Sequence, residues 1–245
     1  MNNVERASVL SEALPYLRAY SKKIVVVNYN SQAVQSKELK KAAISDIVLL
    51  SLVGVRVVVV YDGESEATGE DIVCMITDEG AKAFSFSGLD ASLFTVEKQS
   101  VASTPGEVLY VNPELVMVAL DNGFIPVISP TARDIEKETN LRISAASAAM
   151  ELAVNLKAEK LVILTDQIGI QNKDGSLMSE LPLSKVRLLI KENVISGDMV
   201  HKVDSCVKAV RRGVPRAHIL DGRVQHSILV EMLTDSGIGT MILYD

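Results

Sequence analysis

Three polar residues follow the first apolar run of the chain, at a place where nucleotide enzymes usually bind phosphate. The segment "KIVVVNYNS", residues 23–31, passes from β-branched residues into Asn28, Asn30 and Ser31, and a helical pattern follows. A phosphate site needs backbone N–H groups that approach closely, which favours glycine, together with a cation. Glycine and lysine are both missing from this turn. The turn therefore indicates either an unusual phosphate site or a phosphate site that has been lost.

The next strand end, "YDGES" at residues 61–65, combines one glycine with two acidic residues. Gly63 would allow a close approach, but Asp62 and Glu64 would each repel a triphosphate by roughly 1 kcal/mol or more. In "LTDQIGI", Asp166 follows an apolar strand. It is either a helix-capping or turn residue, or a carboxylate that orients a cation or a lysine in a cleft.

A fourth strand end, "ISGDMVHK" at residues 195–202, has the features of an anion site. Ser196 and Gly197 lead into a helix whose first turn carries Lys202. A glycine turn, a helix N-terminus and a lysine together can bind an anion, although a lysine that faces solvent is the commoner outcome. A serine nucleophile is not indicated, because the chain has no G-x-S-x-G elbow.

Alternating strands and helices must position these residues. Helical patterns separate most of the short β-branched runs, which predicts a largely parallel sheet with helices on both faces. Residues 62–111 are the exception and are predicted to form turns and short hairpins. The predicted strands are "KIVVVNY", "VRVVVVY", "GFIPVIS", "KLVILTD", "RAHIL" and "GTMIL".

An amphipathic helix is predicted at the N-terminus. Ala7, Leu10, Leu14 and Leu17 recur at spacings of three and four and share one stripe. Pro15 lies inside this pattern and should kink or split the helix near residues 11–15. The stripe packs either on its own domain or on another subunit, and periodicity does not separate the two.

Composition bounds the function classes. The chain has 245 residues and a net charge of −6, so it lacks the basic surface that nucleic-acid binding needs. Cys74 and Cys206 lie far apart, and three scattered histidines form no metal-binding pattern, so no metal site is expected. The N-terminus resembles neither a secretory signal nor a membrane span. We expect a cytoplasmic protein, or one of the plastid stroma if a transit peptide has been removed.

The order of these pieces resembles acetylglutamate kinase, of the amino-acid kinase family, over nearly the whole chain. The resemblance implies a three-layer αβα sandwich with a mainly parallel central sheet. It also implies ATP-dependent phosphorylation of N-acetylglutamate in arginine synthesis, with Mg, and three regions: residues 1–22, an oligomerisation helix; 23–157, a substrate lobe; and 158–245, a nucleotide lobe. The matching segments are "VLSEALPYLRAYSKKIVVV", "SDIVLLSLVGVRVVVV", "VNPELV" with "GFIPVISP", "AEKLVILTD", "VISGDMVHKV" and "AHILDGRVQHSILVEMLTDSGIGTMI".

On this resemblance, Asp166 and Lys202 are the retained catalytic residues. The family's other lysine, in "KYGG", falls on Asn28, and its two glycines fall on Asn30 and Ser31. The family's "HGGGP" falls on residues 61–65, so two of its three glycines are replaced. The residues that the resemblance assigns to the nucleotide are Gly63, Thr165, Gly169, Ser196 and Gly197.

The substrate side departs from the family in two ways. Only 24 residues separate Gly63 from Gly88, and the family's substrate-gripping arginine has no counterpart there. The family's "NINAD" aligns with residues 142–146, which places Arg142 at the cleft and replaces an asparagine with Ser144. Because these losses fall on one cleft, we predict little or no acetylglutamate kinase activity.

The resemblance also implies an arginine effector site between the N-terminal helix and the turn "TDSGIGT". Its residues would be Tyr16, Tyr20, Ser236, Gly237 and Gly239, and Ser236 replaces a glutamate, which weakens arginine binding.

Three hypotheses remain. The first is a defective kinase that acts as a structural or regulatory subunit, as a homo-oligomer (dimer or hexamer) or with an active kinase or a signalling protein. The second is a kinase with a rebuilt cleft, and the third is a binding protein for another small ligand.

Overall fold

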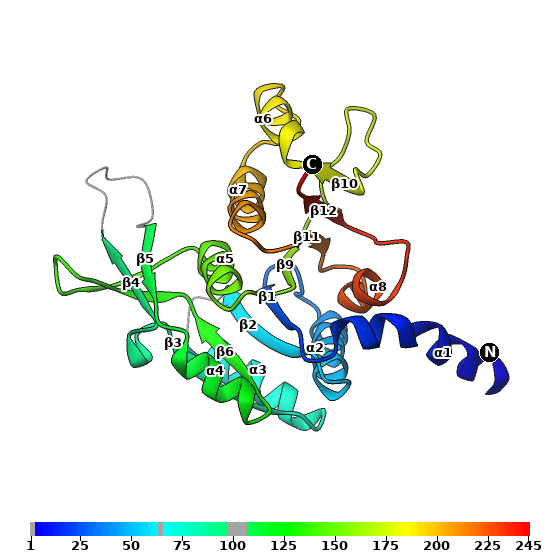
Figure 1. Cartoon of the computed structure of the whole chain (residues 1–245), viewed down its shortest axis with the longest axis horizontal. Helices are drawn as coiled ribbons and strands as arrows, with labels where there is room; N and C mark the ends of the chain where they lie inside the picture. The colour runs from blue at the N-terminus through cyan, green and yellow to red at the C-terminus, as the bar shows by residue number, and fades with distance from the viewer. Residues whose placement is uncertain (1–2, 63–65, 98–106) are drawn as a thin grey trace.

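The predicted alternation of strands and helices is present in the computed structural model, which describes residues 3–62, 66–97 and 107–245 (Figure 1). The helices are α1 (Asn3–Tyr20), α2 (Lys37–Leu52), α3 (Glu66–Asp78), α4 (Glu114–Asp121), α5 (Ala145–Asn155), α6 (Leu183–Lys191), α7 (Asp198–Arg211) and α8 (Ser227–Leu233). The strands are β1 (Ile24–Asn30), β2 (Arg56–Asp62), β3 (Lys82–Ser87), β4 (Phe94–Glu97), β5 (Glu107–Val111), β6 (Phe124–Ser129), β7 (Thr131–Asp134), β8 (Asn140–Arg142), β9 (Lys160–Thr165), β10 (Glu180–Pro182), β11 (Arg216–Asp221) and β12 (Thr240–Leu243).

Most of the strands form one sheet. Within the described residues this sheet has eight strands in the order β10-β12-β11-β9-β1-β2-β6-β3, and the pairing is parallel except between β11 and β12. A second sheet of four strands, in the order β5-β4-β7-β8, lies beside it. β1 pairs with β2 on one side and with β9 on the other. The predicted lobes 23–157 and 158–245 therefore share one sheet, and the boundary between them remains a prediction.

The residues of the central strands alternate between two apolar clusters, one on each face of the sheet. Val26, Val58 and Ile163 pack with α5 and α7, whereas Val25 and Val27 pack with α2, α3 and α8. Figure 1 shows α5, α6 and α7 on one side of the sheet and α2 and α8 on the other. The fold class is thus the expected three-layer α/β sandwich with a mainly parallel sheet, because strands buried on both faces need helices on both faces.

The second helix begins and ends where the sequence predicts. Ser36 is its N-cap, and the Ser36 hydroxyl oxygen accepts a hydrogen bond from the Leu39 backbone N–H at 3.2 Å. Gly54 follows the helix at φ +94°, a backbone conformation that favours glycine.

The prediction of turns and hairpins over residues 62–111 is wrong for its first half. Residues 66–78 form α3, and β3 joins the central sheet in parallel with β6. Gly69 belongs to this stretch, and in α3 it lies against the ring of Tyr61, where a Cβ atom would come within 2.9 Å of the ring. This glycine serves close packing. The expected hairpin is present in the second half, where β4 and β5 pair antiparallel.

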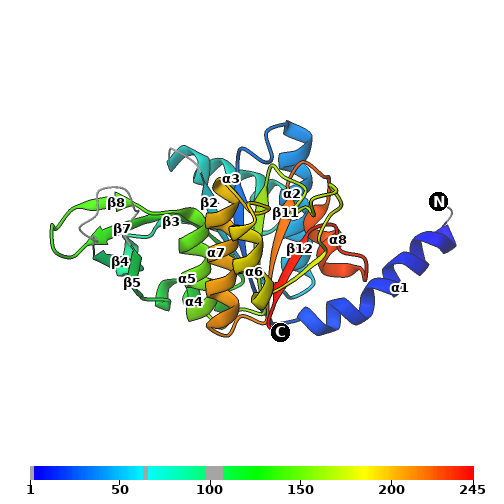
Figure 2. The ribbon, with the colours of Figure 1, turned by 90° about the horizontal axis from the view of Figure 1, so that it is seen from above.

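The N-terminal helix is not split. α1 runs from Asn3 to Tyr20 with Pro15 inside it, and it extends away from the rest of the molecule in both views (Figures 1 and 2). Its last turn contacts the α2/α8 side, where Tyr20 packs against the apolar cluster. None of the helices in the described part of the chain is long and apolar enough to cross a membrane.

Candidate functional site

A cavity of ≈ 890 Å³ opens at the carboxyl ends of β1, β2 and β9, between α5 and α7. In an open parallel sheet this is the edge where ligands bind. Asn28, Ser144, Asp166 and Lys202 all line the cavity, so the structure brings together four residues that the sequence placed at the site. Asp62 lines it as well.

Side chains of the turn after β1 form hydrogen bonds within the sheet and the turn. Asn28 is 4% exposed, and its Nδ2 donates to the Val60 carbonyl oxygen at 3.3 Å. The Gln32 backbone N–H donates to Asn30 Oδ1 at 2.9 Å, and the Ser31 hydroxyl donates to the Asp62 carbonyl oxygen at 2.7 Å. A phosphate site needs backbone N–H groups that point at the ligand. Here one of those N–H groups is bonded within the turn.

Lys202 and Asp166 are linked through a threonine. Lys202 Nζ donates to Thr165 Oγ1 at 3.1 Å, and Thr165 Oγ1 donates to Asp166 Oδ1 at 3.3 Å. Thr165 is fully buried at the end of β9, which fixes the hydroxyl between the two charged groups. Lys202 and Asp166, the two residues that the resemblance assigns to catalysis, therefore both line the cavity.

The glycines of the predicted nucleotide side have different roles. Gly197 is the N-cap of α7 at φ +58°, beside the exposed Ser196. Asp198 follows in the first turn and lines the cavity, so the positive end of this helix already has a carboxylate nearby. Gly169, at φ +113°, lies where a Cβ atom would come within 2.8 Å of the Thr240 hydroxyl, which indicates a packing role. Gly63 lies outside the described residues.

The substrate-side residues separate in the structure. Ser144 is the N-cap of α5, and its hydroxyl oxygen accepts from the Ser147 backbone N–H at 3.4 Å. Arg142 ends β8, and its Nη2 lies 3.9 Å from Asp62 Oδ1 in a partly exposed ion pair. Arg142 therefore contacts the carboxylate at the end of β2, which lines the cavity.

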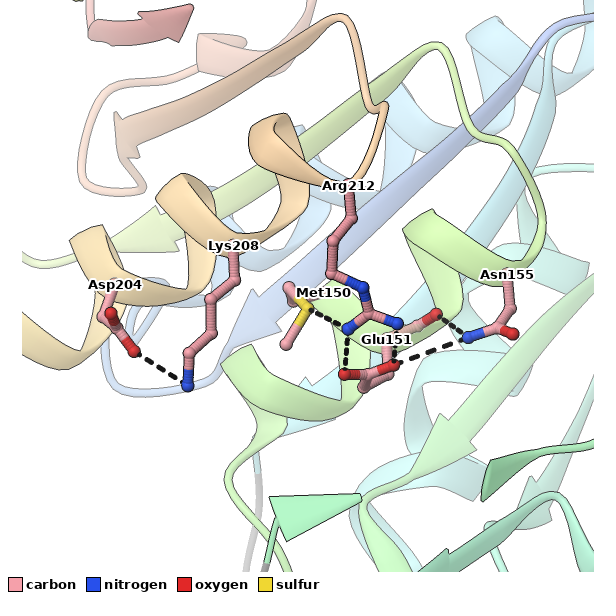
Figure 3. A network of polar contacts seen from close by, with 6 residues as sticks. All are labelled: Met150, Glu151, Asn155, Asp204, Lys208 and Arg212. Atoms are coloured by element: carbon pink, nitrogen blue, oxygen red, sulfur yellow. Dashed lines mark hydrogen bonds and ion pairs between the residues drawn. The ribbon is translucent and has the colours of Figure 1, made fainter. Parts of the chain in front are cut away.

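A polar network between α5 and α7 was not predicted (Figure 3). The Arg212 guanidinium donates two hydrogen bonds to the Glu151 carboxylate, one of them at 3.0 Å to Oε2, and Lys208 Nζ lies 3.1 Å from Asp204 Oδ2. Asn155 Nδ2 donates to the Glu151 carbonyl oxygen at 2.8 Å. Glu151 and Arg212 are 61 residues apart, so local patterns give no signal for their pairing.

Carboxylates outnumber cations in the cavity. The acidic lining residues are Asp62, Glu151, Asp166, Asp198 and Asp204, and the basic ones are Lys202, Lys208 and Arg212. Glu151 and Asp204 neutralise two of the three cations. A triphosphate and a dicarboxylate would both meet excess negative charge here, so the residues present do not fit a nucleotide phosphate chain well. The described residues hold no group of three or more metal-ligating side chains.

The predicted effector residues lie near the end of α1. The Tyr16 hydroxyl donates to Asp235 Oδ1, and Lys160 Nζ lies 4.9 Å from the centre of the Tyr20 ring. Ser236 is exposed, and its carbonyl oxygen accepts from the Thr234 hydroxyl at 3.1 Å. Tyr16 and the turn "TDSGIGT" are therefore in contact.

Gly237 and Gly239 pack around a buried carboxylate. Glu231 Oε2 accepts from the backbone N–H groups of Ile238, at 2.9 Å, and Gly239, at 3.2 Å. A Cβ atom at Gly237 would lie 2.6 Å from the same oxygen. Both glycines therefore have a structural role in the turn, and their predicted contact with an effector stays a prediction.

His218 completes this buried cluster. Its Nδ1 lies 2.7 Å from Glu231 Oε1. Burial lowers the pKa of the His218 imidazole. Burial alone would raise the pKa of the Glu231 carboxyl, but hydrogen bonds from His218 and the backbone outweigh it and hold that pKa below its ordinary value. A neutral imidazole thus donates to an ionised carboxylate.

Comparisons with known proteins identify the family of the chain. A family model described as the amino acid kinase family matches residues 64–221. Acetylglutamate kinase of Desulforamulus reducens is 37% identical over 285 residues, which cover 99% of both chains. The same enzyme of Heliobacterium modesticaldum is 38% identical, with 98% of both chains covered. Because these alignments are longer than the 245-residue chain, the relatives have residues with no counterpart here.

Solved structures share the fold. N-acetylglutamate synthase from Neisseria gonorrhoeae, complexed with coenzyme A and N-acetyl-glutamate, superposes with a TM-score of 0.83 at 23% identity and covers 98% of this chain. The chain spans 63% of the length of that synthase. Carbamate kinase from Giardia lamblia bound to AMP-PNP matches with a TM-score of 0.67 at 17% identity, covering 92% of this chain and 100% of its own. The chain therefore belongs to the amino-acid kinase family and, within it, to the acetylglutamate kinase family.

Proposed function

We propose that this chain is an acetylglutamate kinase-like protein of arginine biosynthesis whose phosphoryl transfer is lost or strongly reduced, and that it acts as a structural or regulatory subunit. One observation carries the proposal. The turn after β1, where a phosphate would need free backbone N–H groups, is closed by Asn28 and Asn30 through hydrogen bonds within the sheet and the turn.

The size of the expected loss follows from electrostatics. Phosphoryl transfer depends on positioning and on groups that neutralise the transferred phosphoryl. One missing preorganised donor costs about 2.7–4 kcal/mol of barrier, roughly a hundred- to thousandfold in rate. Asp62 and Asp198 line the same cavity and oppose the binding of an anion. The excess of carboxylates in the cavity also opposes the phosphates of ATP.

A role in assembly is supported by the N-terminal helix. α1 extends from the body of the molecule, and Tyr16 contacts Asp235 in the turn that follows α8 (Figure 2). An extended helix of this kind suits contact with another chain, whether a second copy in a dimer or hexamer, an active kinase or a signalling protein. Arginine binding beside Tyr20 belongs to the same proposal. Co-purification with an active kinase from the source cells supports the mixed assembly, and an isolated homo-oligomer opposes it.

An active enzyme with a rebuilt cleft is the second candidate. The observation that favours it is the retained line of hydrogen bonds from Lys202 through Thr165 to Asp166. A lysine held in this way could still neutralise one phosphoryl oxygen. This candidate requires MgATP to bind despite the excess of carboxylates.

One assay separates the two candidates. Phosphorylation of N-acetylglutamate is measured with MgATP and the purified protein, and Lys202→Ala controls for contaminating kinase. Lys185→Ala is a matched control, because Lys185 lies on α6 and does not line the cavity. Turnover that Lys202→Ala abolishes and Lys185→Ala leaves intact would overturn the proposed loss of activity. Absence of turnover in all three proteins supports it.

A further inference from the structure

Lys202 donates to a neutral hydroxyl, although a carboxylate follows that hydroxyl directly in the chain. Lys202 Nζ lies 3.1 Å from Thr165 Oγ1, and the next residue, Asp166, lines the same cavity. In the part of the chain that the structure describes, no ion pair joins Lys202 to Asp166. An ammonium group bonds more strongly to a carboxylate than to a neutral hydroxyl. We therefore expect a second partner that holds the Asp166 carboxylate in another direction.

Arg223 supplies a cation beside Asp166. β11 pairs with β9 in register, with Asp221 opposite Thr165, and the Gly222 backbone N–H donates to the Thr165 carbonyl oxygen at 2.8 Å. Asp166 and Arg223 follow these paired positions, so they lie at the same edge of the sheet. Their charges interact: Asp221 is the main cause of the raised pKa of the Arg223 guanidinium, and the charge of Asp166 adds to it.

Arg223 is fixed in this place by its surroundings. Its Nε and Nη2 each donate to the Asp221 carboxylate at 2.9 Å, and its backbone N–H donates to Asp221 Oδ1 at 2.9 Å. Asp221 itself is 4% exposed. Gly222 fits closely against Ala33, where a Cβ atom would come within 2.9 Å of the Ala33 Cβ. The side chain and the backbone of Arg223 are therefore both held in position.

The other neighbour of β9 brings no charge to Asp166. β1 carries Asn28 and Asn30 near its end, and both of these neutral residues line the cavity. Lys202 comes from α7 and reaches β9 through the Thr165 hydroxyl. Of the two strands beside β9, β11 is therefore the one that supplies a cation.

We infer that Arg223 is a positioning residue of the site: held by Asp221, it keeps the Asp166 carboxylate on the β11 side and so leaves the Lys202 ammonium bound to Thr165. Arg223 acts indirectly, because it does not line the cavity itself. An ammonium group that no carboxylate neutralises keeps its charge for an anionic group in the cavity. The inference deepens the proposed function, rests on the site described there, and does not require turnover.

Acetylation of lysines by acetic anhydride, followed by mass spectrometry, tests this arrangement. The reagent attacks the neutral amine, so the labelling of Lys202 slows when its ammonium form is stabilised. Arg223→Gln should release Asp166 to pair with Lys202 and slow this labelling roughly threefold, because a partly screened charge pair contributes a modest free energy. Lys185, on α6 and outside the cavity lining, is the reference within each sample. An unchanged Lys202 rate overturns the inference.

A matched variant and a fold check control for other causes. Arg211→Gln removes the same charge at the exposed end of α7 and should change the Lys202 rate less than about 1.5-fold. Equal slowing in both variants would mean that overall charge acts on Lys202, and the inference fails. Lys160 is 3% exposed, so its labelling rises if a variant unfolds. In that case Arg223→Met, which keeps the alkyl stem, takes the place of Arg223→Gln.

A double-mutant cycle tests whether Arg223 acts through Asp166. In the Asp166→Asn background, Arg223→Gln should change the Lys202 rate less than about 1.5-fold, because the carboxylate that Arg223 positions is gone. Slowing of the same size in both backgrounds would show that Arg223 acts on Lys202 directly, which overturns the positioning role.

The labelling result is separate from the kinase assay. An unchanged Lys202 rate without turnover overturns this inference and leaves the proposed function standing. Turnover that depends on Lys202, together with the expected labelling, overturns the proposed loss of activity and leaves this inference standing.

Discussion

The ion pair between Arg212 and Glu151 gives the sharpest test of the contact between α5 and α7. Arg212→Ala removes a guanidinium that makes two hydrogen bonds to one carboxylate. The Glu151 side chain is 11% exposed and the Arg212 side chain 45% exposed, so the pair lies between a buried and a surface ion pair. The truncation leaves a mostly buried carboxylate without its cation, and we expect a loss of about 2 kcal/mol in the free energy of unfolding.

Thermal unfolding measures this loss. For a chain of this size 1 kcal/mol shifts the Tm by about 2–4 °C, so Arg212→Ala should lower it by roughly 4–8 °C. Arg211→Ala is the matched control, because Arg211 is the exposed neighbour at the end of the same helix. Its effect should stay within about 0.5 kcal/mol.

A double-mutant cycle with Glu151→Gln isolates the pairwise energy. We expect a coupling energy of about 1.5 kcal/mol between Arg212 and Glu151, because they share two charge-assisted hydrogen bonds. A coupling energy below about 0.5 kcal/mol would refute the reasoning. It would mean that the cost of Arg212→Ala comes from lost packing of the side chain, for example against Met150.

Two further predictions concern the C-terminal turn. Burial lowers the pKa of His218, so below about pH 6.5 the unfolded chain takes up a proton that the folded chain does not. The free energy of unfolding should therefore fall as the pH drops through 6.5. Because the pKa of Glu231 is also lowered in the folded chain, this residue should add to the loss below about pH 4.5. Urea unfolding across this range should show a smaller pH dependence in His218→Gln than in the unaltered protein, and equal profiles would contradict the assignment. Gly239→Ala should cost about 3 kcal/mol or more, because its Cβ would clash with a backbone carbonyl of β11, whereas Gly80→Ala, in open space at φ +93°, should cost about 1 kcal/mol. Denaturant midpoints compare the two glycine variants, and a similar loss in both would show that the turn relaxes around the new methyl group.

The elements that the sequence predicts well are those with strong local signals. The run "KIVVV" and the cap at Ser36 each act over a few residues, and both β1 and α2 lie as expected. α3 was missed because Gly69 and its acidic neighbours are typical of a turn. The contact that explains Gly69, the ring of Tyr61, comes from the preceding strand and is visible only in three dimensions.

The site divides in the same way. Asn28, Asp166 and Lys202 could be placed in one cavity because the ends of parallel strands meet at one edge of a sheet. The pairing of Glu151 with Arg212 could not, since it depends on how two helices cross. The missing glycines indicated that this turn does not bind phosphate. The hydrogen bond from the Gln32 backbone N–H to Asn30 Oδ1, however, depends on backbone angles that the sequence does not give.

The position of β1 has a consequence for synthesis on the ribosome. β1 is complete by residue 30, but its partner β9 spans residues 160–165. At a synthesis rate of about 5–20 residues per second, one edge of this apolar strand stays unpaired for roughly 7–27 s. An unpaired edge rich in valine can pair with the same edge of another nascent chain. Slower elongation should therefore lengthen this exposure and favour aggregates, and faster elongation should raise the yield of folded protein.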